Sequence, residues 1–133
     1  LELLDDILLA TPILYATGDC IYVKGVFELA ANANGKTCSL YINSTSIVSH
    51  FTSSLINAKT NILTLEMWIN ITGTNTQSIE TLATRGGYSF PGYTTGTLTT
   101  GSGLTINMYG QNSVASAADI TARILRVEAK NKT

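Results

Sequence analysis

Few residues of this chain have the types and spacing that enzyme chemistry requires. His50 is the only histidine, and no Asp or Glu lies near it in the sequence. A hydrolytic triad needs a nucleophile, a base and an acid in contact, and no nucleophile-elbow pattern accompanies the many serines. We therefore interpret His50 as a structural or surface residue. A hydrolase that uses His50 is the minor alternative, and we expect no enzymatic activity.

The other motifs that could bind a phosphate or a metal are also incomplete. The segment 34–37 ends like a phosphate-binding loop, but that pattern requires a glycine where Ala30 stands and a helix afterwards. The run that follows is strand-like, so we interpret Asn34 and Gly35 as a hairpin turn. One histidine and two distant cysteines fit no zinc spacing. The sequence therefore predicts no metal and no cofactor.

The two cysteines are expected to be free. In the register of that hairpin, Cys38 lies opposite Ala31 and Cys20 lies opposite Ser49, which places the two thiols about 35 Å apart along the ladder. A disulfide needs Cα atoms within about 7 Å of each other. We therefore predict two free, buried thiols.

Aromatic residues are concentrated between Gly86 and Gly96, where glycines and a proline indicate a long loop. Tyr88, Phe90 and Tyr93 lie in this segment. Aromatic rings stack on the apolar faces of sugars, and loop aromatics often anchor binding sites. One interpretation is a glycan-binding loop that uses these three residues. In the other, Phe90 plugs the end of the fold and the tyrosines pack on a neighbouring subunit.

Two further aromatic residues lie on the polar faces of predicted strands. In the segment 61–72, apolar residues occupy every second position from Leu63 to Ile71, so one face of this strand is apolar and the other polar. Trp68 lies on the polar face. Tyr109 likewise lies opposite the inward residues of its own strand. We expect these two rings to be covered by another copy of the chain, with a ligand groove as the second alternative.

These residues would be positioned by a sheet structure. Short alternating segments recur along the chain, separated by turns rich in Gly, Asn, Ser and Thr, and no helical pattern of useful length occurs. Residues 1–10 are ambiguous between an edge strand and a short amphipathic helical turn. The other expected strands are Ile13–Tyr15, Cys20–Ala30, Thr37–Ile42, Ile47–Phe51, Asn61–Thr72, Gln77–Arg85, Leu104–Tyr109 and Ile120–Glu128, with a polar connection at Ser53–Thr60.

About eight strands predict an all-β fold, an antiparallel β-sandwich of jelly-roll type. We expect residue 1 to residue 133 to form a single domain, with 1–12 as a docking or lead-in segment. Gln77–Arg85 is polar on both faces apart from Ile79, Leu82 and Ala83, which suggests a position at an edge or in an interface.

Composition narrows the choice of partners. The net charge is −1 and no basic cluster occurs, which argues against nucleic-acid binding. No apolar run approaches the roughly 18–20 residues that span a bilayer, so we expect no membrane insertion. Charged residues make up only 13% of the chain, about half the usual share. A polar surface built from hydroxyls and amides is consistent with a protein packed among neighbours.

The strand patterns resemble small jelly-roll proteins of virus particles: the head domains of phage fibres and spikes, and capsid decoration proteins. Two stretches carry the resemblance, 63–73 and 100–111, the second of which is followed by 118–128. The resemblance implies a trimeric, non-enzymatic protein on the surface of the virion that contacts other virion proteins or a host surface glycan. It assigns no binding residues to this chain.

We therefore expect a homo-oligomeric structural protein of the virion, acting as a capsid decoration, spike or fibre head. The alternative is a free, lectin-like carbohydrate-binding module that uses residues 86–96.

Overall fold

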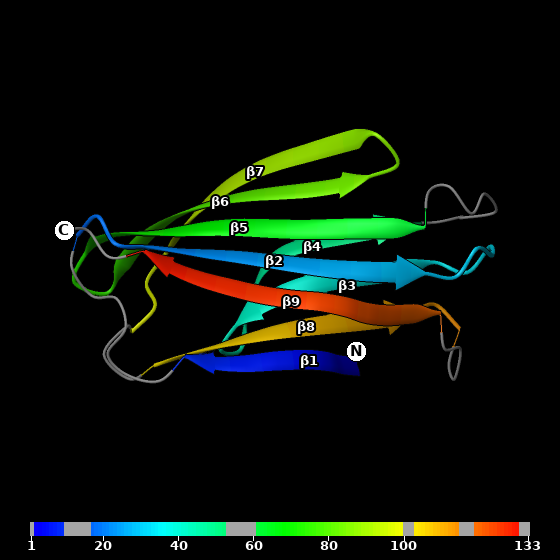
Figure 1. Cartoon of the computed structure of the whole chain (residues 1–133), viewed down its shortest axis with the longest axis horizontal. Coiled ribbons are helices and arrows are strands. Elements are labelled where there is room, and N and C mark those ends of the chain that lie inside the picture. Colours follow the sequence, from blue (N-terminus) through cyan, green and yellow to red (C-terminus); the bar gives the residue numbers. More distant parts are fainter. Residues whose placement is uncertain (1, 10–16, 53–60, 100–102, 115–118, 131–133) are drawn as a thin grey trace.

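The computed structural model is an antiparallel β-sandwich (Figure 1). It describes residues 2–9, 17–52, 61–99, 103–114 and 119–130, and within these residues there are nine strands and no helix. The predicted all-β sandwich is confirmed, with nine strands in place of about eight. The expected strand at Ile13–Tyr15 and the connection at Ser53–Thr60 lie outside the described residues. In chain order the strands are β1 (Glu2–Leu9), β2 (Cys20–Leu29), β3 (Lys36–Ile42), β4 (Thr45–Thr52), β5 (Ile62–Gly73), β6 (Thr76–Arg85), β7 (Tyr88–Gly96), β8 (Leu104–Asn112) and β9 (Ile120–Lys130).

The strands form two sheets that differ in connectivity. The first has the order β1-β8-β3-β4, and the second has the order β7-β6-β5-β2-β9. β8 lies between β1 and β3, so the C-terminal part of the chain pairs beside its beginning. In the second sheet, β5, β6 and β7 are joined as a simple meander. This order does not confirm the jelly-roll connectivity, which stays a prediction.

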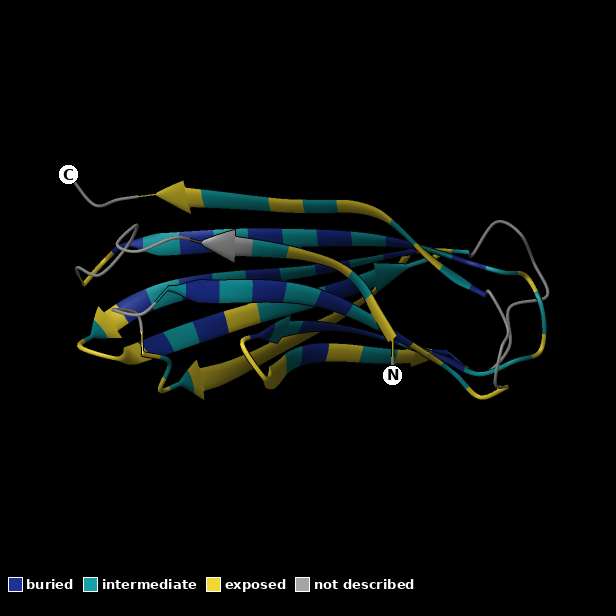
Figure 2. Ribbon diagram, turned by 90° about the horizontal axis from the view of Figure 1, so that it is seen from below, coloured by how far each residue is buried: buried dark blue, intermediate teal, exposed yellow. Residues whose placement is uncertain are grey.

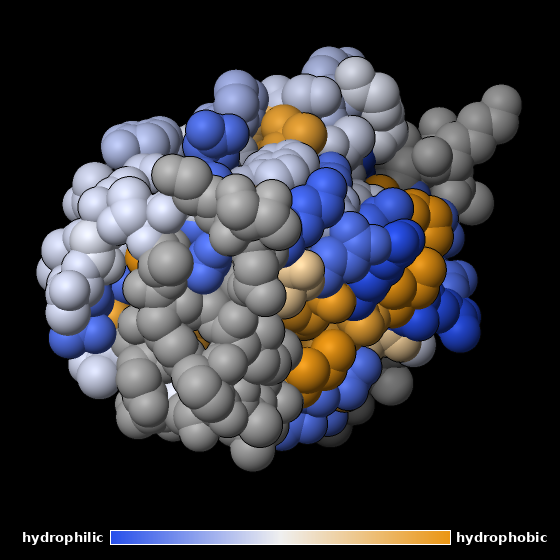
Figure 3. Space-filling view, turned by 60° about the vertical axis from the view of Figure 1, so that its left-hand side comes forward, coloured by the Kyte–Doolittle hydropathy of each residue, from blue (hydrophilic) through white to orange (hydrophobic). Residues whose placement is uncertain are grey.

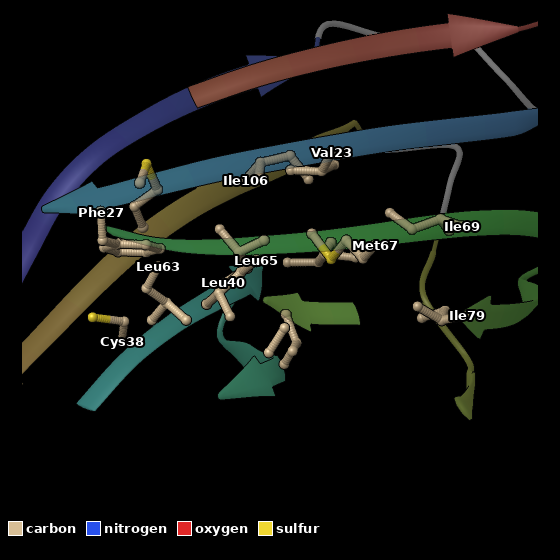
Figure 4. Packing of buried hydrophobic residues seen from close by; sticks show 14 of the residues in the cluster. Val23, Phe27, Cys38, Leu40, Leu63, Leu65, Met67, Ile69, Ile79 and Ile106 are labelled. Carbon is tan, nitrogen blue, oxygen red and sulfur yellow. The ribbon is translucent and has the colours of Figure 1, made fainter. Parts of the chain in front are cut away.

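The core lies between the two sheets and is built by strict alternation. Along β2 and β5 every second side chain is buried, as Figure 2 shows for the central strands. The inward residues of β5 include Leu65 and Met67, which meet Leu40 of β3 from the opposite sheet (Figure 4). The apolar face predicted for Asn61–Thr72 is confirmed as the inward face, and the strands expected at Cys20–Ala30, Thr37–Ile42 and Leu104–Tyr109 also bury one face.

The prediction of a hairpin at Asn34 and Gly35 is wrong. β2 and β3 belong to different sheets, so this segment carries the chain across the sandwich. β2 pairs instead with β5 and β9, and β3 pairs with β4 and β8. An Asn-Gly sequence indicates a local bend, but the strand that follows pairs wherever its apolar face is best buried. The tight turn after β3 occurs at Asn43, which has a φ of 55°.

The prediction of a loop at Gly86–Gly96 is also wrong. Gly86 and Gly87 make a turn with φ angles of 57° and 85°, and the chain returns as β7, paired with β6 from Gln77 to Arg85. β6 is therefore an internal strand rather than an edge strand. β7 was missed because its residues are exposed on both faces, so it lacks the alternation that indicates a half-buried strand.

β1 resolves the ambiguity of residues 1–10, because Glu2–Leu9 forms an edge strand paired with β8. A bulge between Leu3 and Asp5 shifts its register. Leu4 packs against the core. The docking or lead-in role of 1–12 stays a prediction. Within the described residues, no helix is long and apolar enough to cross a membrane.

Adjacent residues of β5 provide a direct test of this alternation. Replacing Leu65, which is fully buried, by alanine should lower the free energy of unfolding by about 2–5 kcal/mol, because it leaves a cavity. Thr64→Ala, on the outer face of the same strand, should change it by no more than about 1 kcal/mol. Urea denaturation measures both. Equal costs for the two variants would contradict the assigned faces.

Candidate functional site

His50 lies on β4, an edge strand of the four-stranded sheet, where β4 comes close to β7, an edge strand of the other sheet. Its ring lies 4.8 Å from the ring of Phe90, measured between centroids. Its Nε2 atom is buried and has no hydrogen-bond partner among the described residues. Burial lowers the pKa of His50, and the nearby Arg85 lowers it further. The contact with Phe90 supports the interpretation of His50 as a structural residue.

The segment that ends like a phosphate-binding loop belongs to a buried polar network. Lys36 is fully buried, and its Nζ donates hydrogen bonds to Asn32 Oδ1 at 2.8 Å and to the carbonyl of Asn34 at 2.9 Å. The amides of the same two asparagines donate to the carboxylate of Asp119, at 3.0 and 2.8 Å. The lysine is therefore already engaged by the protein, and the network ties the connection after β2 to the residue before β9.

Cys20 and Cys38 are both free, as predicted. The hairpin register behind that prediction was wrong, because the two cysteines lie on strands of different sheets. Cys38 is buried in the core, and burial raises its pKa to about 12, although Lys36 opposes this shift. Cys20 is only half-buried and faces outward. Burial raises its pKa as well.

The structure separates the three aromatic residues predicted as a glycan-binding loop. Phe90 pairs with the inward-facing Ala83, so Tyr88 and Phe90 share the inner face of the edge strand β7. Tyr93 pairs with Glu80 and lies on the outer face. All three side chains are exposed, Tyr93 the most at 67%. They therefore do not form one cluster, and only Tyr93 joins the outer face of the five-stranded sheet.

The outer face of the four-stranded sheet carries no charge on β3, β4 and β8. We call it the uncharged face and define it by the outward residues Thr37, Ser39, Tyr41, Ser46, Ser49, Phe51, Thr105, Asn107, Tyr109 and Gln111. The rings of Tyr41 and Tyr109 meet edge to face at its centre, with centroids 4.6 Å apart. Phe51 is 60% exposed. The acids of this sheet lie on the edge strand β1, at Glu2, Asp5 and Asp6, and Asp6 pairs with the outward Asn107.

The outer face of the five-stranded sheet is different. We call it the charged face, and its charged residues are Lys24, Glu28, Glu66, Glu80, Arg123, Arg126, Glu128 and Lys130. Arg123 pairs with Glu28, and Arg126 pairs with Glu128. One row of directly paired residues crosses all five strands of this face, in the order Glu128, Tyr22, Trp68, Glu80, Tyr93.

Trp68 and Tyr22 form the wall of a pocket in this row. Their ring centroids are 5.3 Å apart and the ring planes are tilted by 38°. The pocket has a volume of about 250 Å³, and Cys20, Glu128 and Lys130 complete its lining. The pocket is therefore aromatic on one side, at Tyr22 and Trp68, and carries the charged groups of Glu128 and Lys130 on the other. On the side of the molecule that Figure 3 brings forward, apolar and strongly hydrophilic side chains lie directly beside each other.

Tyr22 is held in place by a hydrogen bond from its hydroxyl to the carboxylate of Glu66. Burial and this bond raise the pKa of Tyr22 to about 12, so its hydroxyl is protonated at neutral pH. Sequence reasoning found Trp68 and Tyr109 but missed their respective partners, Tyr22 and Tyr41. The polar-face position of Tyr22 was the available signal, but pairing of β2 with β5 cannot be read from a single sequence.

Comparisons with known proteins identify no relative, because no protein-family model, no curated protein and no solved structure matches this chain. Within the described residues, no group of three or more His, Cys, Asp or Glu side chains could hold a metal ion. The site must therefore be interpreted from its own geometry.

The network around Asp119 predicts a specific response to acid. Hydrogen bonds from Asn34 and Asn32, together with Lys36, lower the pKa of Asp119 below 3.8, although burial opposes the shift. Its carboxylate therefore stabilises the fold above that pH, and this contribution is lost as the pH falls through the lowered pKa. Asp119→Asn should lower the free energy of unfolding at pH 7 by roughly 1.5–3 kcal/mol and flatten its decline below pH 3.8. Urea denaturation across pH measures this, and an unchanged acid decline would contradict the assignment.

Proposed function

We propose that this chain is a non-enzymatic structural protein of a virus particle, and that it assembles as a homo-oligomer through its uncharged face. The observation that supports assembly is the absence of charge from the outward residues of β3, β4 and β8 around the Tyr41–Tyr109 pair. The location on the virion surface, as a capsid decoration, spike or fibre head, is supported by the resemblance of the strand patterns to such proteins.

The physical argument for self-association is the cost of desolvation. An interface that buries a charged side chain without a partner is penalised heavily, so the centres of interfaces are depleted of charge and enriched in aromatic residues. The uncharged face meets both conditions. Its hydroxyl and amide groups can also exchange hydrogen bonds with the polar groups of a neighbouring copy.

The charged face is much less suited to this role. A second copy placed over Trp68 would have to cover Glu66 on the same strand, Glu80 on the next strand and Glu128 two strands away. Of the two aromatic residues expected at a subunit interface, we therefore assign Tyr109 to the interface and leave Trp68 open. A trimer is the assembly that the resemblance implies. In such a trimer, the acids of the edge strand β1 would lie at the margin of the contact between subunits. Other virion proteins would contact the edges of the sandwich that the trimer leaves exposed.

A charge placed at the centre of the uncharged face should prevent assembly. Tyr109→Arg should weaken self-association by roughly tenfold or more, because an unpaired guanidinium would be buried. Thr64→Arg places the same charge on the central strand of the opposite sheet and should leave assembly unchanged. Native mass spectrometry over a concentration series reports the oligomer, and circular dichroism confirms that each variant is folded.

A second variant on the same face tests whether any effect of Tyr109→Arg comes from the added charge or from local misfolding. Ser46→Arg alters an exposed side chain that pairs with Tyr41 on the same face, and it should weaken assembly in the same direction. A wild-type protein that is monomeric at all concentrations would refute the proposed assembly. If Thr64→Arg dissociates the oligomer and Tyr109→Arg does not, the interface lies on the five-stranded sheet, which would refute the proposed use of the uncharged face.

A further inference from the structure

We propose that the pocket between Tyr22, Trp68, Glu128 and Lys130 binds a neutral pyranose sugar, and that Tyr93 extends this site to a longer saccharide. The pocket lies on the charged face, opposite the surface proposed for assembly. The inference therefore does not rest on self-association, and the two are tested separately.

The shape and lining of the pocket match the chemistry of a sugar ring. A pyranose presents apolar C–H groups on its faces and hydroxyls around its edge, so it needs an aromatic surface with hydrogen-bonding groups beside it. The tilted rings of Tyr22 and Trp68 supply the aromatic surface. The carboxylate of Glu128 accepts hydrogen bonds and the ammonium of Lys130 donates them. A volume of about 250 Å³ is below the roughly 300–1,000 Å³ of pockets for drug-sized ligands, which suits one sugar ring.

The aromatic wall is preorganised by the sheet. Trp68 lies on β5, which is paired on both sides by β2 and β6. Tyr22 lies on β2, which is paired by β5 and β9, and the hydrogen bond from its hydroxyl to Glu66 fixes its ring. A rigid aromatic surface loses little conformational entropy when a ligand binds. The rings of Tyr22 and Trp68 therefore need no rearrangement before a sugar binds.

The charges around the pocket favour a neutral sugar over an acidic one. Glu66, Glu80 and Glu128 lie beside Tyr22 and Trp68 in the paired register. Three basic groups, Lys24, Arg126 and Lys130, lie among these acids, and Arg126 pairs with Glu128. The charges around the pocket therefore balance and leave no net positive charge to attract a carboxylate on the ligand. Carboxylates of the protein are good acceptors for the hydroxyls of a neutral sugar.

Tyr93 gives the site a direction. It follows Glu80 in the row that contains Trp68, two strands away, which corresponds to about 10 Å at the usual spacing of strands. Its side chain is 67% exposed. A saccharide of several units that runs along the row, across the strands, would stack one ring near Trp68 and a later ring on Tyr93. Glu80 lies between them as an acceptor.

Titration of the 133-residue chain with methyl glycosides of glucose, galactose and N-acetylglucosamine, followed through the fluorescence of Trp68, tests the proposal. At least one of these neutral sugars should bind with a Kd on the order of 1 mM, and the matching trisaccharide should bind about tenfold more tightly. Sialic acid is the acidic comparison and should bind more weakly. No response to any neutral sugar or trisaccharide up to roughly fifty times that concentration would overturn the proposal.

Matched variants locate the site, with binding measured by calorimetry so that the readout does not depend on the tryptophan. Trp68→Ala should abolish detectable binding of both ligands, whereas Tyr93→Ala should remove only the advantage of the trisaccharide. Phe51→Ala removes an exposed ring from the uncharged face and should have no effect on sugar binding. If Trp68→Ala does not fold, Glu128→Gln replaces it, and it should weaken binding of the single sugar by about tenfold.

The outcomes separate the two proposals. Sugar binding that persists in a monomeric protein would uphold the pocket and refute the proposed assembly. An oligomer that binds no neutral sugar would uphold the proposed assembly and refute the sugar-binding pocket. Loss of binding in Phe51→Ala to the same extent as in Trp68→Ala would refute the placement of the site.

Discussion

The close packing of the two sheets determines which side chains this molecule can present on its surface. The core between the sheets is filled by every second residue of the central strands, and those residues are almost entirely excluded from solvent. Because strand side chains alternate, each buried residue commits its neighbours to the outer face. Burial of Met67 and Ile69 on β5, for example, leaves Trp68 no position except outside.

Pairing between strands then arranges these outward residues into rows. On the five-stranded sheet, the register aligns Tyr22, Trp68 and Tyr93 across the strands and intersperses them with carboxylates. On the four-stranded sheet, the register brings Tyr41 and Tyr109 together among uncharged groups. The two surfaces therefore have opposite characters although the same core produces both. One is suited to covering by a second copy, and the other to a polar ligand in water.

The local features of this fold were predictable, whereas the long-range pairing was not. Alternation alone identified β2, β3, β5 and β8 and their inward faces, because burial on one side leaves a clear period of two. It failed for β7, an edge strand exposed on both faces. The Asn34–Gly35 bend was recognised, but the strand after it crosses to the other sheet, which no local pattern reports.

The same limit explains what was predictable about the candidate sites. Trp68 and Tyr109 stood out as rings on polar faces of their own strands. Their partners Tyr22 and Tyr41 could be found only once β2 was known to pair with β5, and β3 with β8. Tyr88, Phe90 and Tyr93 were grouped by their closeness in the sequence. Alternation along β7 separates Tyr93 from the other two.

The most direct test of the account is the accessibility of Trp68 in the assembled protein, since Trp68 is the only tryptophan in the chain. Quenching of its fluorescence by acrylamide can be compared between a dilute, dissociated sample and a concentrated, assembled one. If assembly uses the uncharged face, the quenching constant should be the same in both samples, because Trp68 stays open to solvent. A clear fall in the quenching constant on assembly would place Trp68 between subunits and contradict the roles assigned to the two faces.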